Sequence, residues 1–115
     1  MAAGVYDILC EQGATFRKTF TWLDENEQPI NLTGCSARMQ VRPTYNSTTP
    51  WLSLVSPTAI TITPLTGQIL VTVNATATAA LPVKRGVYDL EVVMSTGEVI
   101  RLVQGSFTVS PEVTR

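Results

Sequence analysis

The segment from Val87 to Thr108, VYDLEVVMSTGEVIRLVQGSFT, contains two strand-like runs on either side of the turn Ser95-Thr96-Gly97. Apolar and polar residues alternate along both runs, which places the apolar side chains of each strand on one face. Together with the glycine-containing turn, this alternation predicts a β-hairpin. The apolar face of its first strand is expected to consist of Tyr88, Leu90, Val92 and Met94. Neighbouring segments repeat the pattern, so we expect a small antiparallel sandwich.

The second strand of this hairpin changes its alternation part of the way along. Ile100 and Leu102 share one parity, whereas Phe107 and Val109 share the other. A bulge adds one residue to one strand, and glycine permits the backbone geometry that a bulge needs. We therefore expect a one-residue bulge at Gln104-Gly105, which would place all four apolar side chains on the same face.

Four further segments have the alternation of strands with one buried face. They are residues 14–23, 35–42, 60–63 and 68–73. Lys18 interrupts the apolar row of the first segment, and we expect it either at the rim of the sandwich or where the sheet is open on one side. Residues 74–81 are rich in alanine and precede Pro82, which predicts one short helical turn. The predicted core includes Phe20, Met39, Val71, Leu90, Val92 and Phe107.

The fold class that these segments predict is all-β. At 115 residues the chain is long enough for one hydrophobic core but not for two, so we expect residues 1–115 to form a single domain. Short alternating strands separated by turn signals are typical of immunoglobulin-like sandwiches. The sequence therefore predicts an antiparallel immunoglobulin-like β-sandwich with one short helical turn and an irregular loop at residues 43–57.

Residues that carry enzymatic chemistry are scarce. The chain has no histidine, which removes the usual general base and every Ser-His or Cys-His nucleophile pair. Asp24, Glu25 and Glu27 lack the loop ligands and glycine of an EF-hand, so they are expected to form a solvated turn. Asp89 and Glu91 share a strand face, which we interpret as a polar outward face because no second acidic strand is placed to make a cleft. We predict a protein that is not an enzyme, with no catalytic residue, no metal site and no cofactor.

Cys10 and Cys35 lie on different predicted strands. A disulfide between them requires that these strands pair or face each other with Cα atoms within about 7 Å. The alternative is two small buried hydrophobic side chains in a reducing compartment, which is the usual behaviour of free cysteine. The sequence favours the second interpretation and leaves the first open.

Charge and hydropathy limit the classes of partner. A formal net charge of -1 gives no electrostatic reason to bind nucleic acid or an acidic membrane surface. No segment approaches the roughly 18 consecutive apolar residues that a membrane span needs. Only 15% of the residues are charged, against about 25% in typical soluble domains, so the surface is expected to be polar without being strongly charged. We expect neither nucleic acid nor membrane as a partner.

The loop at residues 43–57 carries the candidate binding residues. It contains three prolines and several turn formers, with one short strand expected around Trp51 to Leu54. The other strands supply enough apolar residues to close a sandwich, so this loop is expected to be free for a partner, with prolines that lower the entropy lost on docking. Trp51 has two interpretations, an interface anchor or a plug that closes the open end of the sandwich. The predicted partner-binding residues are Tyr45, Trp51, Leu52 and Leu54.

Three stretches carry a resemblance that covers residues 13–114. They are Trp22-Leu23-Asp24, the stretch from Pro29 to Gly34 and the closing stretch from Leu102 to Thr114. In the order of its segments the chain resembles the small β-sandwich virion proteins of tailed bacteriophages, and it is similar in plan to the N-terminal domain of the lactococcal phage upper-baseplate protein. The loop at residues 43–57 departs from this plan, because it is longer and more aromatic.

The resemblance implies a non-enzymatic structural component of a tailed-phage virion that is present in many copies. Its implied partners are other virion proteins, in a homo-oligomer or symmetric multi-copy assembly, and its implied location is the virion, assembled in the host cytoplasm. Two placements stay open, the tail, baseplate or fibre-attachment region and a decoration (cement) protein on the capsid. Outside this class, the alternative is a carbohydrate-binding module that stacks a glycan on Trp51 and Tyr45.

Overall fold

The computed structural model describes residues 3–114, which form nine strands and two short helices. In chain order these are β1 (Gly4–Val5), β2 (Ile8–Glu11), β3 (Phe16–Thr21), β4 (Ser36–Arg42), β5 (Leu52–Val55), β6 (Ile60–Thr63), η1 (Pro64–Thr66), β7 (Gln68–Val73), α1 (Ala75–Ala79), β8 (Arg85–Val93) and β9 (Val99–Ser110). The predicted hairpin is thus β8 and β9, and every other predicted strand is present within a few residues of its expected bounds.

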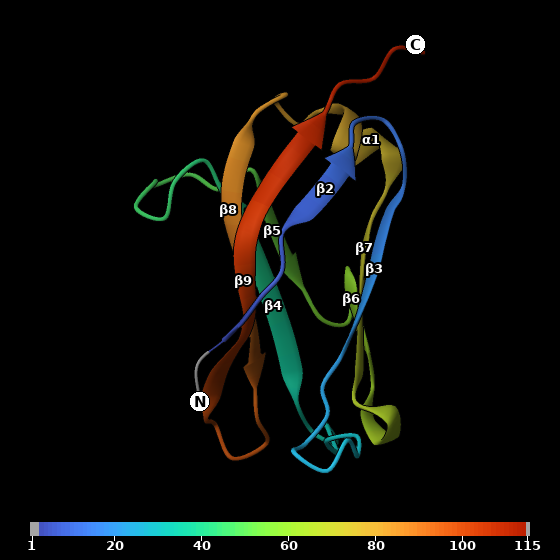
Figure 1. The fold of residues 1–115 in the computed structure, drawn as a ribbon, viewed down its shortest axis with the longest axis vertical. Helices are drawn as coiled ribbons and strands as arrows, with labels where there is room; N and C mark the ends of the chain where they lie inside the picture. Colours follow the sequence, from blue (N-terminus) through green and yellow to red (C-terminus); the bar gives the residue numbers. More distant parts are fainter. Residues whose placement is uncertain (1–2, 115) are drawn as a thin grey trace.

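The strands form two sheets that pack face to face (Figure 1). The larger sheet has the order β1-β9-β8-β4-β5, with β2 also pairing with β9, and the smaller sheet has the order β3-β7-β6. Along the chain, β3 lies in the smaller sheet, β4 and β5 in the larger, β6 and β7 in the smaller, and β8 and β9 in the larger. This exchange of strand pairs between two sheets is the arrangement of immunoglobulin-like sandwiches, so the predicted fold class is confirmed.

The antiparallel pairing that the sequence predicts does not extend to the N-terminus. β1 and β2 both run parallel to β9, with Gly4 beside Val103 and Ile8 beside Phe107. The chain bends between these two strands, and a Cβ atom at Gly105 would collide there with the carbonyl group of Tyr6. Glycine is therefore required at position 105 by the close approach of the N-terminal segment.

The bulge in β9 exists, but it lies nearer the hairpin turn than expected. Leu90 pairs with Val103 and the next residue of β8, Glu91, pairs with Arg101, so Leu102 is the extra residue. Gly105 lies in regular register opposite Tyr88. The change of parity shows that the bulge lies between Ile100 and Phe107 but does not fix which residue is extra. Gly105 lies in this stretch because Tyr6 approaches it closely, and it is not the bulged residue.

The core lies between the two sheets and contains all six residues predicted for it. Phe20, Met39, Val71, Leu90, Val92 and Phe107 are each buried. The short helix is also confirmed, since α1 is capped by Asn74, whose side-chain oxygen accepts a hydrogen bond from the amide of Ala77 at 2.8 Å. The buried hydroxyl of Thr78 donates to the carbonyl of Ala14 at 2.8 Å, which ties this helix to the turn before β3.

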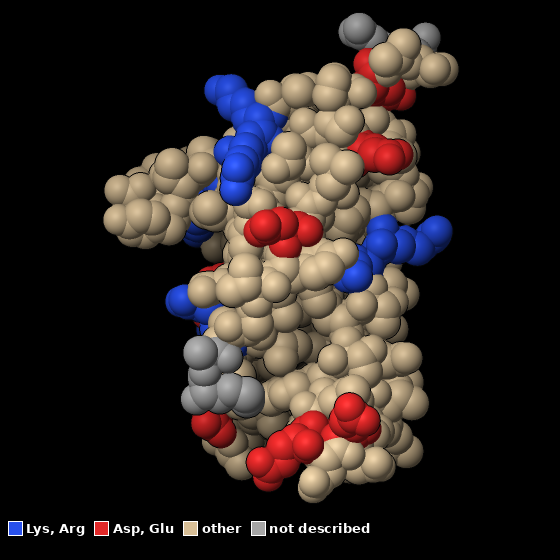
Figure 2. All heavy atoms as spheres, viewed as in Figure 1, with Lys and Arg blue, Asp and Glu red and all other residues tan. Residues whose placement is uncertain are grey.

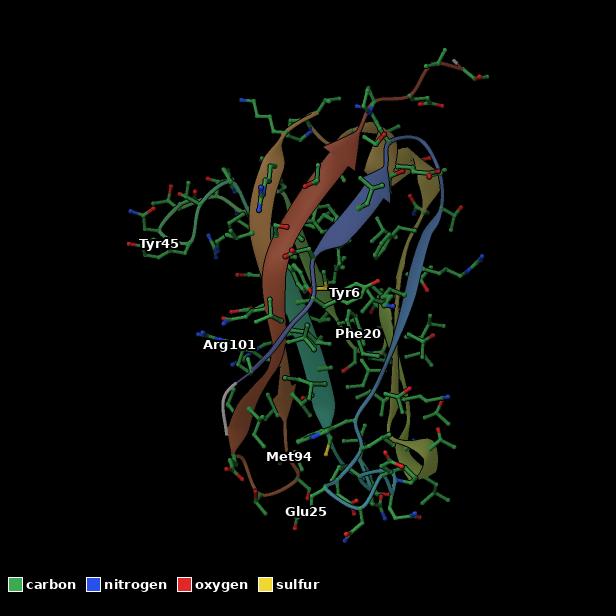
Figure 3. The ribbon with its side chains drawn as sticks, in the orientation of Figure 1. Tyr6, Phe20, Glu25, Tyr45, Met94 and Arg101 are labelled. Carbon is green, nitrogen blue, oxygen red and sulfur yellow. The ribbon has the colours of Figure 1, made fainter. Side chains whose placement is uncertain are left out.

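Lys18 lies on β3, which is an edge strand of the smaller sheet. Its side chain is half-buried, and its Nζ lies 4.3 Å from the ring centroid of Tyr6. Tyr6 in turn packs edge-to-face on Phe20 (Figure 3). The position of Lys18 on an edge strand agrees with both expectations, but its ammonium group lies over an aromatic ring instead of in water, as the rim alternative required.

Both cysteines are free thiols. Cys10 is buried in β2, and burial raises the pKa of its thiol. Cys35 is half-buried just before β4, with its Sγ 3.9 Å from Sδ of Met94. The interpretation as unpaired cysteines is therefore confirmed, although only Cys10 is fully enclosed.

Tyr88 provides a test of how the N-terminal segment is held. Its buried hydroxyl donates a hydrogen bond to the carbonyl of Tyr6 at 2.5 Å, and burial raises its pKa. Tyr88→Phe is expected to lower the free energy of unfolding by about 1 kcal/mol, the usual net value of one such bond. Urea denaturation measures this loss, and Tyr45→Phe is the control because the Tyr45 side chain is exposed. Equal effects of the two substitutions would show that the bond to Tyr6 contributes nothing.

Candidate functional site

The four predicted partner-binding residues do not form one cluster. Tyr45 is 88% exposed on a loop that projects from the body of the sandwich (Figures 1 and 3). Trp51 and Leu52 are half-buried and pack against the core, and Leu54 is buried in β5 opposite Met39 of β4. Of the four, Tyr45 alone presents most of its side chain to solvent.

The expectation that the core does not need these residues is wrong for Leu54 and for Trp51. β5 extends the larger sheet by pairing with β4. Because β5 is short and lies among prolines, its alternation of buried and exposed residues is not recognisable in the sequence. The ring of Trp51 fills space beside Gly86, where an added Cβ would lie 2.5 Å from its Cζ3 atom. Trp51 therefore packs against the core, which agrees with its interpretation as a plug, while the role of Tyr45 in binding stays a prediction.

The loop that carries Tyr45 is held by its own polar side chains. The hydroxyls of Thr44 and Ser47 are 2.8 Å apart, and the hydroxyl of Thr44 also donates to the side-chain oxygen of Asn46 at 2.9 Å. Arg42 at the end of β4 donates from Nη1 to the carbonyl of Ser47 at 2.7 Å. These bonds restrict the loop on both sides of Tyr45, so less conformational entropy is lost when its ring is bound.

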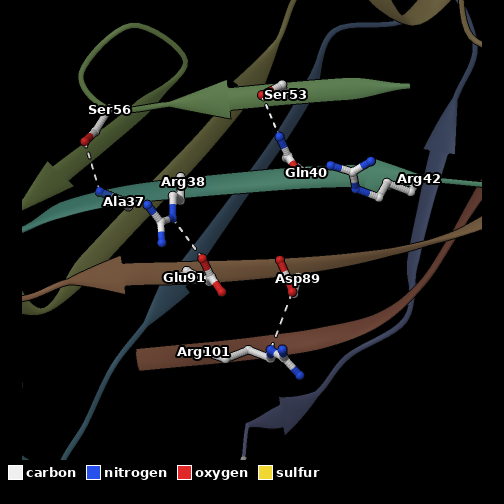
Figure 4. Close-up of polar contacts among 9 residues, drawn as sticks. All are labelled: Ala37, Arg38, Gln40, Arg42, Ser53, Ser56, Asp89, Glu91 and Arg101. Atoms are coloured by element: carbon white, nitrogen blue, oxygen red, sulfur yellow. Dashed lines mark hydrogen bonds and ion pairs between the residues drawn. The ribbon is translucent and has the colours of Figure 1, made fainter. Parts of the chain in front are cut away.

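The outward face of β4, β8 and β9 carries an ordered set of polar contacts (Figure 4). Arg38 Nε lies 2.8 Å from Oε1 of Glu91, and Arg101 Nε lies 3.4 Å from Oδ2 of Asp89. Gln40 lies between Arg38 and Arg42 on β4, opposite Asp89, and accepts a hydrogen bond from Nη2 of Arg42 at 2.7 Å. We call this set, Arg38, Gln40, Arg42, Asp89, Glu91 and Arg101, the polar lattice.

The carboxylates of the polar lattice are balanced by arginines. Partial burial raises the pKa of Asp89, and the nearby charge of Glu91 raises it further, while Arg101 acts in the opposite direction. Each carboxylate therefore has a guanidinium partner, and the side chains of both arginines in these pairs remain more than half exposed, at 52% for Arg38 and 54% for Arg101. These guanidinium groups retain N–H donors that can bind a partner.

A broad open hollow lies over the polar lattice, with a volume of about 690 Å³. Tyr45 lines it on the side of the projecting loop, and Val5 of β1, which is 75% exposed, lines it on the other side. In the view of Figure 2, charged side chains of both signs are scattered over the molecule, and the projecting loop carries none. Both acidic and basic side chains line the hollow, which is open and broad, so its surface is of mixed charge.

Sequence reasoning placed Asp89 and Glu91 on an outward face but did not connect them with Arg38, Arg42 and Arg101. The signal was present, because basic residues alternate along β4 and acidic residues alternate along β8. Their pairing depends on the register of the two strands, in which Arg38 lies opposite Glu91. That register is a tertiary property.

Residues 3–114 contain no group of three or more acidic, cysteine or histidine side chains that could hold a metal ion. In the same part of the chain, no helix has the length and apolar character needed to cross a bilayer. The outer face carries exposed guanidinium groups, amides and one exposed aromatic ring.

Comparison with known proteins gives structural neighbours but no sequence family. No protein-family model matches the sequence, and no curated protein matches it. The N-terminal four immunoglobulin domains of Dscam1 isoform 7.44 share 13% identity over 96% of this chain and 24% of that one, with a TM-score of 0.47. The extracellular domain of the voltage-gated sodium channel β4 subunit shares 12% identity over 98% of this chain and 97% of that one, with a TM-score of 0.46. This chain therefore spans about a quarter of the Dscam1 structure.

Proposed function

We propose that this chain is a non-enzymatic protein-interaction module that serves as a structural component of a tailed-phage virion. The observation that carries the proposal is the presentation of Tyr45, which is 88% exposed on a hydrogen-bonded loop beside the polar lattice. Tyrosine and arginine are the residue types that protein interfaces concentrate, because each combines a large contact area with fixed hydrogen-bond donors. A neighbouring subunit would cover the hollow and pack against the ring of Tyr45.

A protein partner fits this surface better than a glycan does. Binding a sugar ring by stacking requires an exposed aromatic face, and the alternative of a carbohydrate-binding module used both Trp51 and Tyr45. The ring of Trp51 is half-buried beside Gly86, so a single exposed ring remains on this loop. The hollow is open and its floor carries paired charges, which suits a broad macromolecular contact.

The placement in a virion rests on the resemblance to tailed-phage sandwich proteins. The tail, baseplate or fibre-attachment region is the placement that this resemblance favours, with decoration of the capsid as the second candidate. In either place the protein would be assembled in the host cytoplasm in many symmetric copies. Identification of the subunit that covers Tyr45 distinguishes the two placements.

Site-specific crosslinking during particle assembly tests the proposal. A photoreactive phenylalanine analogue at position 45 should crosslink in purified particles to one defined tail, baseplate or capsid subunit, identified by mass spectrometry. The same analogue at Leu65, which is 74% exposed in η1 between β6 and β7 of the smaller sheet, is the control. Absence of the protein from particles, or equal crosslinking from both positions, would contradict the proposal, and crosslinking to a glycan would assign the carbohydrate alternative.

A further inference from the structure

A second surface, separate from the polar lattice, lies on the open side of the sandwich. β2 pairs with β9, and β3 pairs with β7, and the structure shows no other strand partner for either within residues 3–114. A groove of about 270 Å³ lies between them and is lined by residues of both strands and of the turn that joins them. Backbone N–H and C=O groups along a free strand edge are a template for another strand.

Apolar and basic side chains predominate in this groove. Tyr6 is 45% exposed and Leu9 is 63% exposed, and both line the groove together with the half-buried Phe16. Arg17 and Lys18 also line it, and within residues 3–114 neither forms an ion pair. Glu11 is the single acidic residue among the lining side chains.

Lys18 is the side chain that controls access to the edge of β3. It shares the parity of Phe16 and Phe20 and therefore points toward the space between the sheets, with its Nζ 4.3 Å from the ring centroid of Tyr6 and 5.9 Å from that of Phe20. An inward-pointing charge on an edge strand is a known device against uncontrolled strand pairing, because an apolar strand cannot cover it. A strand with an acidic residue in register can cover it, since the carboxylate would replace the aromatic ring as the partner of the ammonium group.

We propose that this groove binds an extended strand of a partner protein, which adds to the edge of β3 and places a glutamate or aspartate on Lys18. Main-chain hydrogen bonds to β3 would supply affinity. Specificity would come from the side chains of the bound strand, with an apolar residue against Leu9 and an acidic residue on Lys18. A second copy of β3 is a poor occupant, because pairing two such edges brings Arg17 and Lys18 of both copies together. The site is independent of Tyr45, so it would connect the protein to a second neighbour.

A tethered strand provides a probe of known composition. The amide of Gln12 donates to the carbonyl of Ser110 at 2.9 Å, so the end of β9 lies next to the turn at one end of the groove. A flexible glycine-serine linker followed by a strand of alternating valine and threonine with one central glutamate is appended to the C-terminus of the full chain. The tether holds the probe at an effective concentration in the millimolar range.

Amide hydrogen exchange measured by NMR gives the result. We expect exchange of the groove-facing amides of β3 to slow at least tenfold relative to the chain with the linker alone, and to slow little when lysine replaces the central glutamate. Lys18→Glu should reverse this preference, so that the lysine strand protects β3. Lys84→Glu is the matched control, because Lys84 is exposed in the turn before β8, outside the groove, and it should leave the preference for glutamate unchanged.

Three results would overturn the proposal. One is equal protection of β3 by the glutamate and lysine strands, which would remove the role of Lys18. Another is protection confined to the edges of β5 or β6, which would move strand addition to a different site. The third is no slowing of exchange in β3 with either strand. If Tyr45 nevertheless crosslinks to a subunit, this inference fails while the proposed function stands.

Discussion

Phe107→Ala is expected to lower the free energy of unfolding by about 3–5 kcal/mol, the range found for large aromatic residues removed from a core. The Phe107 side chain is fully buried, and its ring packs edge-to-face on Phe16 with the centroids 6.1 Å apart. Alanine would leave a cavity between the two sheets and remove this aromatic contact. Urea denaturation followed by circular dichroism measures the loss.

Val99→Ala is the matched control for Phe107→Ala. Val99 lies on the same strand but is 48% exposed near the hairpin turn, so its truncation should change stability by no more than about 0.5 kcal/mol. An unchanged denaturation midpoint for Phe107→Ala would mean that the register of β9 after the bulge at Leu102 is wrong.

Leu54→Ala is expected to lower the free energy of unfolding by about 2–5 kcal/mol, as other buried leucine truncations do. The side chain is 9% exposed and β5 holds it opposite Met39, so its removal opens space at the edge of the core. Tyr45 lies on the loop between β4 and β5, just before the strand that carries Leu54. Tyr45→Ala should change stability by less than about 0.5 kcal/mol and should instead reduce incorporation into particles. Thermal or urea denaturation of the two variants separates a core residue from an interface residue.

The opposite pattern has an equally definite meaning. If Leu54→Ala kept the stability of the unsubstituted protein but lost incorporation, Leu54 would belong to an interface and β5 would not pack as described. If Tyr45→Ala lowered stability by several kcal/mol, its loop would be part of the fold and the proposed binding role would lose its basis.

The local elements of this protein follow from short-range sequence patterns. The alternation around Tyr88, Leu90 and Val92 specifies one buried face, and Ser95-Thr96-Gly97 turns the chain into the next strand. Asn74 caps α1, as its side chain predicts. These features depend on residues within a few positions of one another, so the sequence by itself determined most of the strands, the six predicted core residues and the fold class.

The tertiary structure decided which strands are neighbours and which way they run. Nothing local shows that β2 lies parallel to β9, or that Gly105 is small because the carbonyl of Tyr6 approaches it. The candidate sites depend on the same long-range information. Arg38 meets Glu91 only through the register of β4 and β8, and Lys18 faces a groove only because no strand of the chain extends the smaller sheet beyond β3 within residues 3–114. Pairing between distant segments is set by how the two apolar faces pack together, which alternation along a single strand does not encode.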